Sequence, residues 1–260
     1  MDSRRIKAMT ERQFKRTLER EGKTVVKTLN QEEVTVLFRE VKGSSGEHIS
    51  IYYTYDTNLE KGDIVEYKKH RYILTNENSI QSDVFKVSKL KRCTVTLPIY
   101  GVNIPMAFAS SDVFASNFGS VLIDNLGLVT KYTQDIDFLE RGKQYICFGS
   151  TYKVKNFFIN DGLVYILLER IGNATYGLQE IKYYGETSYS LSEKKVYLPF
   201  EVVTSIDDIV WADAPIVFTS SGTNIAEIDE NGWLTFNKSG VVTITATCGD
   251  ISLKKSITIR

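Results

Sequence analysis

Residues 59–74 read LEKGDIVEYKKHRYIL, and residues 139–154 read LERGKQYICFGSTYKV. In both segments a Leu-Glu-basic-Gly sequence precedes a tyrosine by ten residues, the offset is 80 residues throughout, and Asn76 aligns with Asn156. Each segment predicts a turn at the glycine, a strand, a short polar turn and a returning strand. The shared turn, spacing and aromatic residue favour duplication of a small β-barrel unit over two ordinary hairpins.

Outside this repeat, short runs of β-forming residues predict a mainly β chain. Tyrosine (15) and phenylalanine (13) are plentiful and proline (4) is rare, a composition typical of pleated, half-buried strands. The cluster GSSG at residues 43–46 leads into a predicted strand at 49–55. Asp-Gly at 161–162 and Asn-Gly at 231–232 predict two further hairpins, because these pairs tolerate the positive φ of tight turns.

The one predicted helix runs from Ser3 to about Glu21, with Gly22 as its stop. Its apolar residues form a narrow stripe at roughly helical spacing, and eight basic against four acidic residues up to Lys23 leave a net charge of +4. Two interpretations stay open: a helix packed on the β-domain, or a docking helix for an acidic partner surface.

The C-terminal segment, residues 201–260, has the opposite charge balance. It carries eight acidic and four basic residues, a net charge of −4. Apolar residues alternate with threonines over 242–248, and the same period returns over 251–259 with Lys255 as the exception. This alternation predicts a sandwich of two sheets, each with one face in water.

Residues 98–120 have poor periodicity and several aromatic residues among Gly, Ala and Ser. We expect a long connection with one short helix after Ser110-Ser111-Asp112. Long loops in compact domains are usually functional or interfacial, so an aromatic loop with few charges favours a subunit contact.

Charge and motif content exclude several classes of function. The net charge is zero, which gives no indication of a polyanionic partner, and the longest apolar run is too short to span a bilayer. The N-terminus lacks the apolar region of a secretory signal, and three cysteines without CxxC spacing predict neither a disulfide framework nor a zinc site. We expect a chain without cofactor, metal or membrane contact.

No catalytic constellation is persuasive. Phosphate-loop, dinucleotide-binding and zinc-protease motifs are absent from the sequence, and His48 and His70 lie beside turn residues. Asp207-Asp208 are adjacent on a predicted strand and point to opposite faces. Asp135 and Asp137 share a face, yet they are interpreted as a polar strand entry that lacks the oxygen-rich loop of a calcium site. We predict that the protein is not an enzyme.

Residues 216–248 strongly resemble the bacterial Ig-like group 2 (BIG2) domain. The earlier strands, around Tyr189 to Thr204, fit the family less well. The resemblance implies an Ig-like sandwich used for binding or display. The positions that carry it are Ser220-Ser221, Asn224, Ala226, Asp229, Asn231-Gly232, Lys238-Ser239-Gly240 and Thr243 to Thr247.

Residues 1–97 are similar to the head-closure (stopper) or head–tail connector proteins of tailed bacteriophages. The likeness is carried by the basic helix, by GKTVVKT at 22–28 and above all by EKGDIVEY at 60–67 with the YIL that follows. The second barrel-like copy and the Ig-like segment depart from the minimal family. They leave open whether the chain is the stopper, a neighbouring neck ring or another tail component.

Together these features predict a structural virion protein of the phage neck. The resemblance implies a homo-oligomeric ring of six or twelve copies that joins portal or adaptor to the tail terminator or tail tube and helps close the DNA channel. Packaged DNA would lie near the lumen without sequence-specific contact, and assembly would take place in the host cytoplasm. The expected division is 1–22 docking helix, 23–97 first β-barrel-like unit, 98–171 second β-barrel-like unit including the loop 98–120, and 172–260 Ig-like domain.

Three alternatives remain. The chain could be another tail or baseplate component, or a host-surface-binding adhesin module that uses its Ig-like domain. A cell-wall enzyme is the third alternative, and it would need an acid/base pair such as Asp135 and Asp137.

Overall fold

A computed structural model describes residues 3–28, 32–40, 48–78, 84–110, 113–115, 124–205 and 207–260. Strands account for 56% of the chain and helices for 11%, so the prediction of a mainly β protein is confirmed. The predicted glycine–serine cluster at 43–46 lies outside the described residues. None of the described helices is long and apolar enough to cross a membrane.

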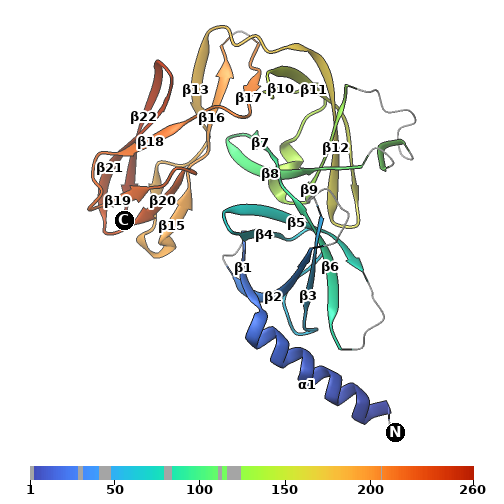
Figure 1. Ribbon diagram of the computed structural model, residues 1–260. Helices are drawn as coiled ribbons and strands as arrows, with labels where there is room; N and C mark the ends of the chain where they lie inside the picture. The colour runs from blue at the N-terminus through green and yellow to red at the C-terminus, as the bar shows by residue number, and fades with distance from the viewer. Residues whose placement is uncertain are drawn as a thin grey trace.

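The N-terminal helix α1 spans Ser3–Glu21, the bounds that the sequence predicted, and ends where the Gly22 N–H donates to the Leu18 carbonyl at 2.8 Å. It leads into a closed barrel and projects away from it (Figure 1). The barrel has the strand order β1-β2-β3-β6-β5-β4 around a core of aliphatic and tyrosine side chains. Its strands are β1 (Lys23–Lys27), β2 (Glu33–Glu40), β3 (His48–Tyr53), β4 (Ile64–Tyr67), β5 (His70–Asn78) and β6 (Lys86–Arg92).

The next six strands repeat the order of the barrel. They run β7-β8-β9-β12-β11-β10 within a larger sheet, which is the barrel order with every number raised by six. These strands form an open half-barrel. Its elements are β7 (Val95–Ile99), β8 (Val102–Phe108), β9 (Leu126–Lys131), the 3-10 helix η1 (Gln134–Phe138), β10 (Gln144–Cys147), β11 (Ser150–Asn160) and β12 (Leu163–Asn173).

The local geometry of the 80-residue repeat matches closely. Gly62 and Gly142 have φ of 88° and 89°, and their N–H groups donate to Leu74 and Val154 at 2.7 and 2.8 Å. β4 and β10 start and end at positions 80 residues apart, and β5 and β11 also begin 80 residues apart. Each returning strand also has a register irregularity at the equivalent place, after Leu74 and after Val154. The structure therefore supports the interpretation of an internal repeat.

The two repeats differ in how the strand edge is completed. In the barrel, β1 pairs antiparallel with β4 through Val26↔Glu66 and Lys27↔Val65. In the half-barrel the equivalent residues Tyr145 and Ile146 pair in parallel with β17 (Val210–Trp211), which comes from the C-terminal part of the chain. The half-barrel edge is thus completed by a later strand instead of by its own first strand.

In the structure the C-terminal segment begins at residue 179, earlier than the charge balance indicated, and it contains two sheets that share one apolar core. A four-stranded sheet has the order β14-β22-β21-β18, and a three-stranded sheet has the order β15-β20-β19. In β21 the predicted alternation is observed, since Val242, Ile244, Ala246 and Cys248 are buried. The elements are β13 (Gln179–Tyr183), β14 (Ser188–Tyr189), η2 (Leu191–Glu193), β15 (Lys195–Tyr197), β16 (Phe200–Thr204), β18 (Val217–Ser220), β19 (Ala226–Ile228), β20 (Trp233–Phe236), β21 (Gly240–Cys248) and β22 (Ile251–Ile259).

Strand β16 links the half-barrel to the C-terminal segment. All five of its residues are buried; Phe200 packs in the C-terminal core, while Val203 packs in the half-barrel core. β13, β16 and β17 extend the half-barrel into a nine-stranded sheet, so the expected boundary at 171/172 does not coincide with the end of a sheet. A strand shared by two cores restricts relative motion of the units it joins.

The expected long connection at 98–120 is a hairpin over its first half, which corrects the prediction. β7 and β8 pair from Val95↔Met106 to Ile99↔Val102, and Tyr100 and Gly101 form the turn with φ of 46° and 76°. The two prolines in these strands obscured the pattern. Residues 113–115 are helical, as expected for a short helix at that place, and Phe114 is buried. Residues 111–112 and 116–120, including Phe118, lie outside the described residues.

Candidate interaction sites

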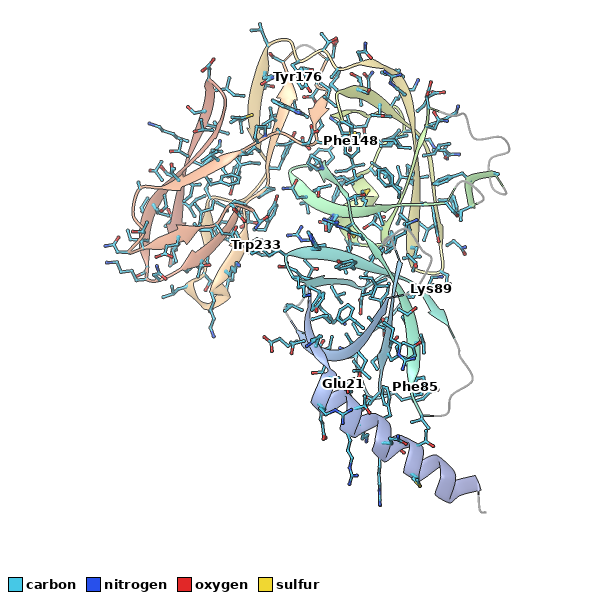
Figure 2. The ribbon with its side chains drawn as sticks, viewed as in Figure 1. Glu21, Phe85, Lys89, Phe148, Tyr176 and Trp233 are labelled. Carbon is cyan, nitrogen blue, oxygen red and sulfur yellow. The ribbon has the colours of Figure 1, made fainter. Side chains whose placement is uncertain are left out.

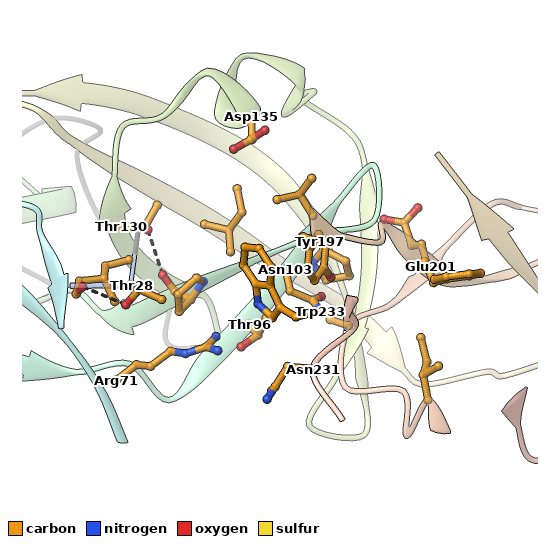
Figure 3. A pocket seen from close by; sticks show the side chains of 18 of the residues that line it. Thr28, Arg71, Thr96, Asn103, Thr130, Asp135, Tyr197, Glu201, Asn231 and Trp233 are labelled. Atoms are coloured by element: carbon orange, nitrogen blue, oxygen red, sulfur yellow. Dashed lines mark hydrogen bonds between the residues drawn. The ribbon is translucent and has the colours of Figure 1, made fainter. Parts of the chain in front are cut away.

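A cleft of about 460 Å³ lies where the barrel, the half-barrel and the C-terminal segment meet (Figure 3). Its walls include Arg71 from β5, Asn103 from β8 and Trp233 from β20. Ligand sites in proteins occur preferentially in concave places between domains and have volumes of roughly 300–1,000 Å³. The cleft therefore has the size and position of a binding site.

One end of the cleft is fixed by a buried ion cluster. The Asp63 carboxylate, 3% exposed, contacts the Lys27 ammonium at 2.9 Å and the Lys131 ammonium at 2.5 Å, and it accepts the Glu60 N–H at 3.0 Å. Burial alone would raise the pKa of Asp63, but hydrogen bonds from Lys131, Glu60 and Lys27 outweigh it and lower the pKa. Because Lys27 belongs to β1 and Lys131 to β9, the cluster ties the barrel to the half-barrel.

A small apolar interface supports the same joint. Ile73 of the barrel packs in a buried cluster with Ala107, Val129 and Leu163 of the half-barrel. At Gly62 a side chain would meet Leu163 and Lys131 at 3.2 Å, so the repeat glycine also permits close approach of the two units. An exposed ion pair between Lys61 and Asp161, with 2.5 Å between Nζ and Oδ2, lies beside this contact.

The opposite end of the cleft is the joint with the C-terminal segment. A Cβ at Gly101 would lie 2.5 Å from the Pro199 carbonyl carbon, so only glycine fits this contact. The Tyr197 hydroxyl donates to the Gly101 carbonyl at 2.9 Å. Burial raises the pKa of Tyr197 to about 12, which keeps this hydroxyl protonated as a donor. The β7–β8 turn is therefore held firmly against the C-terminal segment.

Glu201 on β16 is a buried carboxyl group at this joint. It is 3% exposed, accepts the Tyr184 hydroxyl at 3.0 Å and the Gly101 N–H at 3.4 Å, and forms no ion pair with any residue that the structure describes. Burial raises its pKa, against the opposing effects of Tyr184, Gly101 and Lys143. Because Glu201 accepts two hydrogen bonds and pairs with no described cation, its role at the joint is to hold Tyr184 and Gly101 in place.

Between these two ends the cleft wall has an aromatic centre. The rings of Trp233 and Tyr197 meet edge to face with centroids 5.4 Å apart, and the Lys195 ammonium lies 5.3 Å from the Trp233 centroid. Trp233 is on the side of the C-terminal segment that faces the barrel (Figure 2). The Arg71 guanidinium, also half-buried in the wall, has no hydrogen bond or ion pair among the described residues.

A second group of aromatic residues is exposed at the outer surface of the joint. Tyr100, Phe138 and Tyr184 are each more than a third exposed, and the Tyr100 ring contacts both others with centroids 5.7 and 5.4 Å apart. Exposed apolar side chains in contact with one another are typical of interaction surfaces.

Helix α1 contacts the barrel through few side chains. Phe14 stacks on Phe85 at 4.9 Å between centroids, while Met9 is 72% exposed. Arg12 and Arg16 are exposed and form no ion pair with the side chains that the structure describes. Beyond its anchored C-terminal part, the helix presents basic side chains to solvent, consistent with a contact surface for another molecule.

The acidic pairs considered from the sequence lie in turns and a 3-10 helix, and both Asp137 and Asp208 have polar partners. Asp135 and Asp137 lie in the 3-10 helix η1 instead of at a strand entry, because the chain turns around the buried Ile136. Asp137 accepts the Tyr132 hydroxyl at 2.8 Å. Asp208 is not on a strand; it has φ of 54° and binds Lys182 at 2.5 Å.

The remaining titratable groups are dispersed over the part of the chain that is described. No group of three His, Cys, Asp or Glu side chains there could hold a metal ion, and the three cysteines are free. His70 is exposed at the β4–β5 turn and contacts the Arg92 guanidinium at 3.1 Å. His48 begins β3, and its side chain lies outside the described residues.

The cleft was missed by sequence reasoning. Its lining comes from residues more than 100 positions apart, and Arg71, Asn103 and Trp233 have no spacing that a motif search could find. The only local signal was the pair of turns: the Gly62 turn and the Asn231-Gly232 turn both border the cleft.

Comparison with known proteins finds a family match for the N-terminal part of the chain. Residues 4–92, which contain most of α1 and the whole closed barrel, match the YomX N-terminal domain, a phage-associated family. No curated protein matches the chain. The match covers about the N-terminal third of the chain, and the half-barrel and C-terminal segment lie beyond the matched residues.

Proposed function

We propose that the protein is a structural component of the phage neck, which forms a homo-oligomeric ring between portal or adaptor and tail and helps to close the DNA channel. The observation that carries the proposal is that the phage-associated match covers one compact unit: the barrel together with its projecting basic helix. A domain with an exposed basic helix at its N-terminus is suited to docking on another protein.

The rest of the chain suits a passive building block. The nine-stranded sheet and the shared strand β16 join the half-barrel rigidly to the C-terminal segment. Each subunit would then transmit force as a stiff body, and the exposed Tyr100–Phe138–Tyr184 surface would contact a neighbouring subunit. In this proposal the C-terminal segment is a BIG2-like domain that projects outward, and no catalysis takes place.

The direct test mixes purified protein with portal and adaptor rings and measures mass by light scattering and shape by negative-stain microscopy. We expect a closed ring of six or twelve copies that adds one layer to the portal assembly. A protein that stays monomeric in the presence of these rings would contradict the proposal.

The docking role of α1 is tested separately by charge reversal. Arg12→Glu with Arg16→Glu should abolish addition to the portal–adaptor assembly, because the helix would repel an acidic surface. The matched control is Lys238→Glu with Lys254→Glu, which makes the same change of charge at exposed positions of the C-terminal segment. Equal docking by both double variants would show that the helix does not carry the contact.

A tail or baseplate component that binds the host surface is the second candidate. The observation in its favour is the cleft, which presents polar and aromatic side chains beside the C-terminal segment. Labelled antibodies on intact particles distinguish the two, since a neck protein lies next to the head and a baseplate protein at the far end of the tail.

A further inference from the structure

We infer that the cleft around Trp233 binds a short oligosaccharide, neutral or with a single acidic group. The inference is independent of the position of the protein in the particle.

The walls of the cleft are held in position by contacts at both ends. Its two ends are held by the Asp63 ion cluster and by the Gly101–Pro199 contact, and the shared strand β16 keeps its walls at a set separation. A cavity with fixed walls binds a ligand without first having to order itself, which lowers the entropic cost of binding.

Several polar side chains in the wall have unused hydrogen-bonding capacity. Within the described part of the chain, the Arg71 guanidinium, the Asn103 and Asn231 amides, the Thr96 hydroxyl and the Trp233 indole N–H have no hydrogen-bond partner. Figure 3 shows these side chains around one region, with Arg71 directed from the barrel toward Trp233 and Thr96. They come from all three units, so only the assembled fold brings them together.

The types of these side chains select the class of ligand. An amide offers both donors and acceptors, and a guanidinium offers several donors in a plane, which together match the hydroxyl groups of a sugar. The Trp233 indole supplies an aromatic surface for the apolar C–H face of a pyranose ring. Lys195 lies over the indole at 5.3 Å and Tyr197 meets it edge to face, and the indole still forms part of the cleft wall.

Charge argues against the main alternative, a polyphosphate or nucleic acid. Asp63 and Glu32 together balance the charges of Lys27 and Lys131, so Arg71 is the one cation of the described cleft wall without an acidic partner. Asp135 and Glu230 also line the cleft and would repel a polyanion. One unpaired guanidinium can balance a ligand with one carboxylate, and it can also donate hydrogen bonds to a neutral ligand.

Binding to the wild-type chain is first measured by saturation-transfer NMR, because Trp211 also lines the cleft. The full chain with Trp211→Phe then leaves Trp233 as the only tryptophan, and its fluorescence reports on the cleft. The probes are N,N′-diacetylchitobiose, maltose and 3′-sialyllactose, which carries one carboxylate. Each is titrated while emission is recorded, with binding confirmed by saturation-transfer NMR. We expect at least one probe to shift the Trp233 emission and to receive saturation from the protein.

Two variants locate the site, with binding followed by saturation-transfer NMR. Arg71→Ala and Trp233→Ala should each weaken binding of the active probe at least about tenfold, a change of 1.4 kcal/mol. The controls are Arg92→Ala and Phe148→Ala, which remove a guanidinium and an exposed aromatic ring outside the cleft lining and should leave the affinity unchanged. Asn231→Ala, at an exposed turn where no described partner is lost, gives a third variant that is expected to fold normally.

Two results would overturn the inference. One is the absence of binding for all three probes at millimolar concentration. The other is an affinity that is unchanged in Arg71→Ala, Trp233→Ala and Asn231→Ala, which would place the sugar elsewhere. Neither result bears on ring formation with portal and adaptor, so the two proposals fail separately.

Discussion

The barrel and the half-barrel have the same strand order and the same turn geometry, yet only the first closes on itself. In the barrel the edge of β4 pairs with β1, whereas in the half-barrel the equivalent edge of β10 pairs with β17. Hydrogen bonds at a strand edge must be satisfied in either case. The comparison teaches that one repeat can become an independent unit and the other a platform for a further domain, through the choice of a single closing strand.

The position of charge differs between the repeats as well. Asp63 follows the first repeat glycine and is buried between two lysines, whereas Lys143 holds the equivalent place in the second repeat and pairs with Asp208 at 3.6 Å near the surface. The same turn position therefore anchors a joint between units in one copy and a surface ion pair in the other.

The largest loss of stability is expected from a substitution in β17, the strand that completes the edge of the half-barrel. Val210 is fully buried in the half-barrel core, so Val210→Asp should lower the free energy of unfolding by more than about 3 kcal/mol. Hydrogen exchange should show lost protection in β10–β12 and β16 together, with protection retained in β1–β6. Uniform loss across all strands would mean that the repeats do not unfold as separate units.

The second largest loss of stability is expected at Asp63, and it can be compared with the loss at Lys143, the equivalent position in the second repeat. Asp63→Asn leaves the ammonium groups of Lys27 and Lys131 without their main carboxylate and should cost about 2–4 kcal/mol in urea unfolding. Lys143→Ala, at the equivalent position, removes an exposed pair and should cost less than about 1 kcal/mol. Equal losses would show that the ion cluster is not what joins the units.

The Asp63 contribution should also depend on pH. Since the pKa of Asp63 is lowered in the folded state, its stabilising effect is present above the unfolded value of about 3.9 and is lost as the pH falls through the lower folded value. The difference between the wild type and Asp63→Asn should therefore shrink in unfolding curves below about pH 4.

A smaller change, which increases stability instead of lowering it, is expected for a substitution of Glu201 at the other end of the cleft. The pKa of Glu201 is raised in the folded state, so ionisation of this group opposes folding at neutral pH. Glu201→Gln should raise the melting temperature at pH 7, and this gain should disappear as the pH falls below the unfolded pKa. A lower melting temperature at pH 7 would mean that the carboxylate is needed to hold Gly101 and Tyr184.

The smallest effect concerns the second turn of each repeat. Lys69 has φ of 64° and its equivalent Gly149 has φ of 70°, a region that glycine adopts without steric cost. Lys69→Gly should stabilise the barrel by about 0.5–1 kcal/mol, and Gly149→Lys should destabilise the half-barrel by a similar amount in thermal unfolding. If both changes act in the same direction, the two turns are not equivalent.

Local signals predicted the elements of this protein well. The helix bounds, the Asp161-Gly162 and Asn231-Gly232 hairpins and the buried alternation of β21 all follow from turn chemistry and periodicity. The β7–β8 hairpin was missed because Pro98 and Pro105 interrupt its pattern, although both are accommodated in the pairing. The neck-ring, BIG2 and partner assignments stay predictions.

The amino-acid sequence by itself determined the mainly β class and the internal repeat, because strand periodicity and glycine turns depend on neighbouring residues. Only the tertiary structure decided which strand closes each repeat, that β16 belongs to two cores, and that Arg71, Asn103 and Trp233 share one cleft. These features rest on contacts between residues far apart in the chain. Such contacts are selected by the packing of whole units, which no local pattern records.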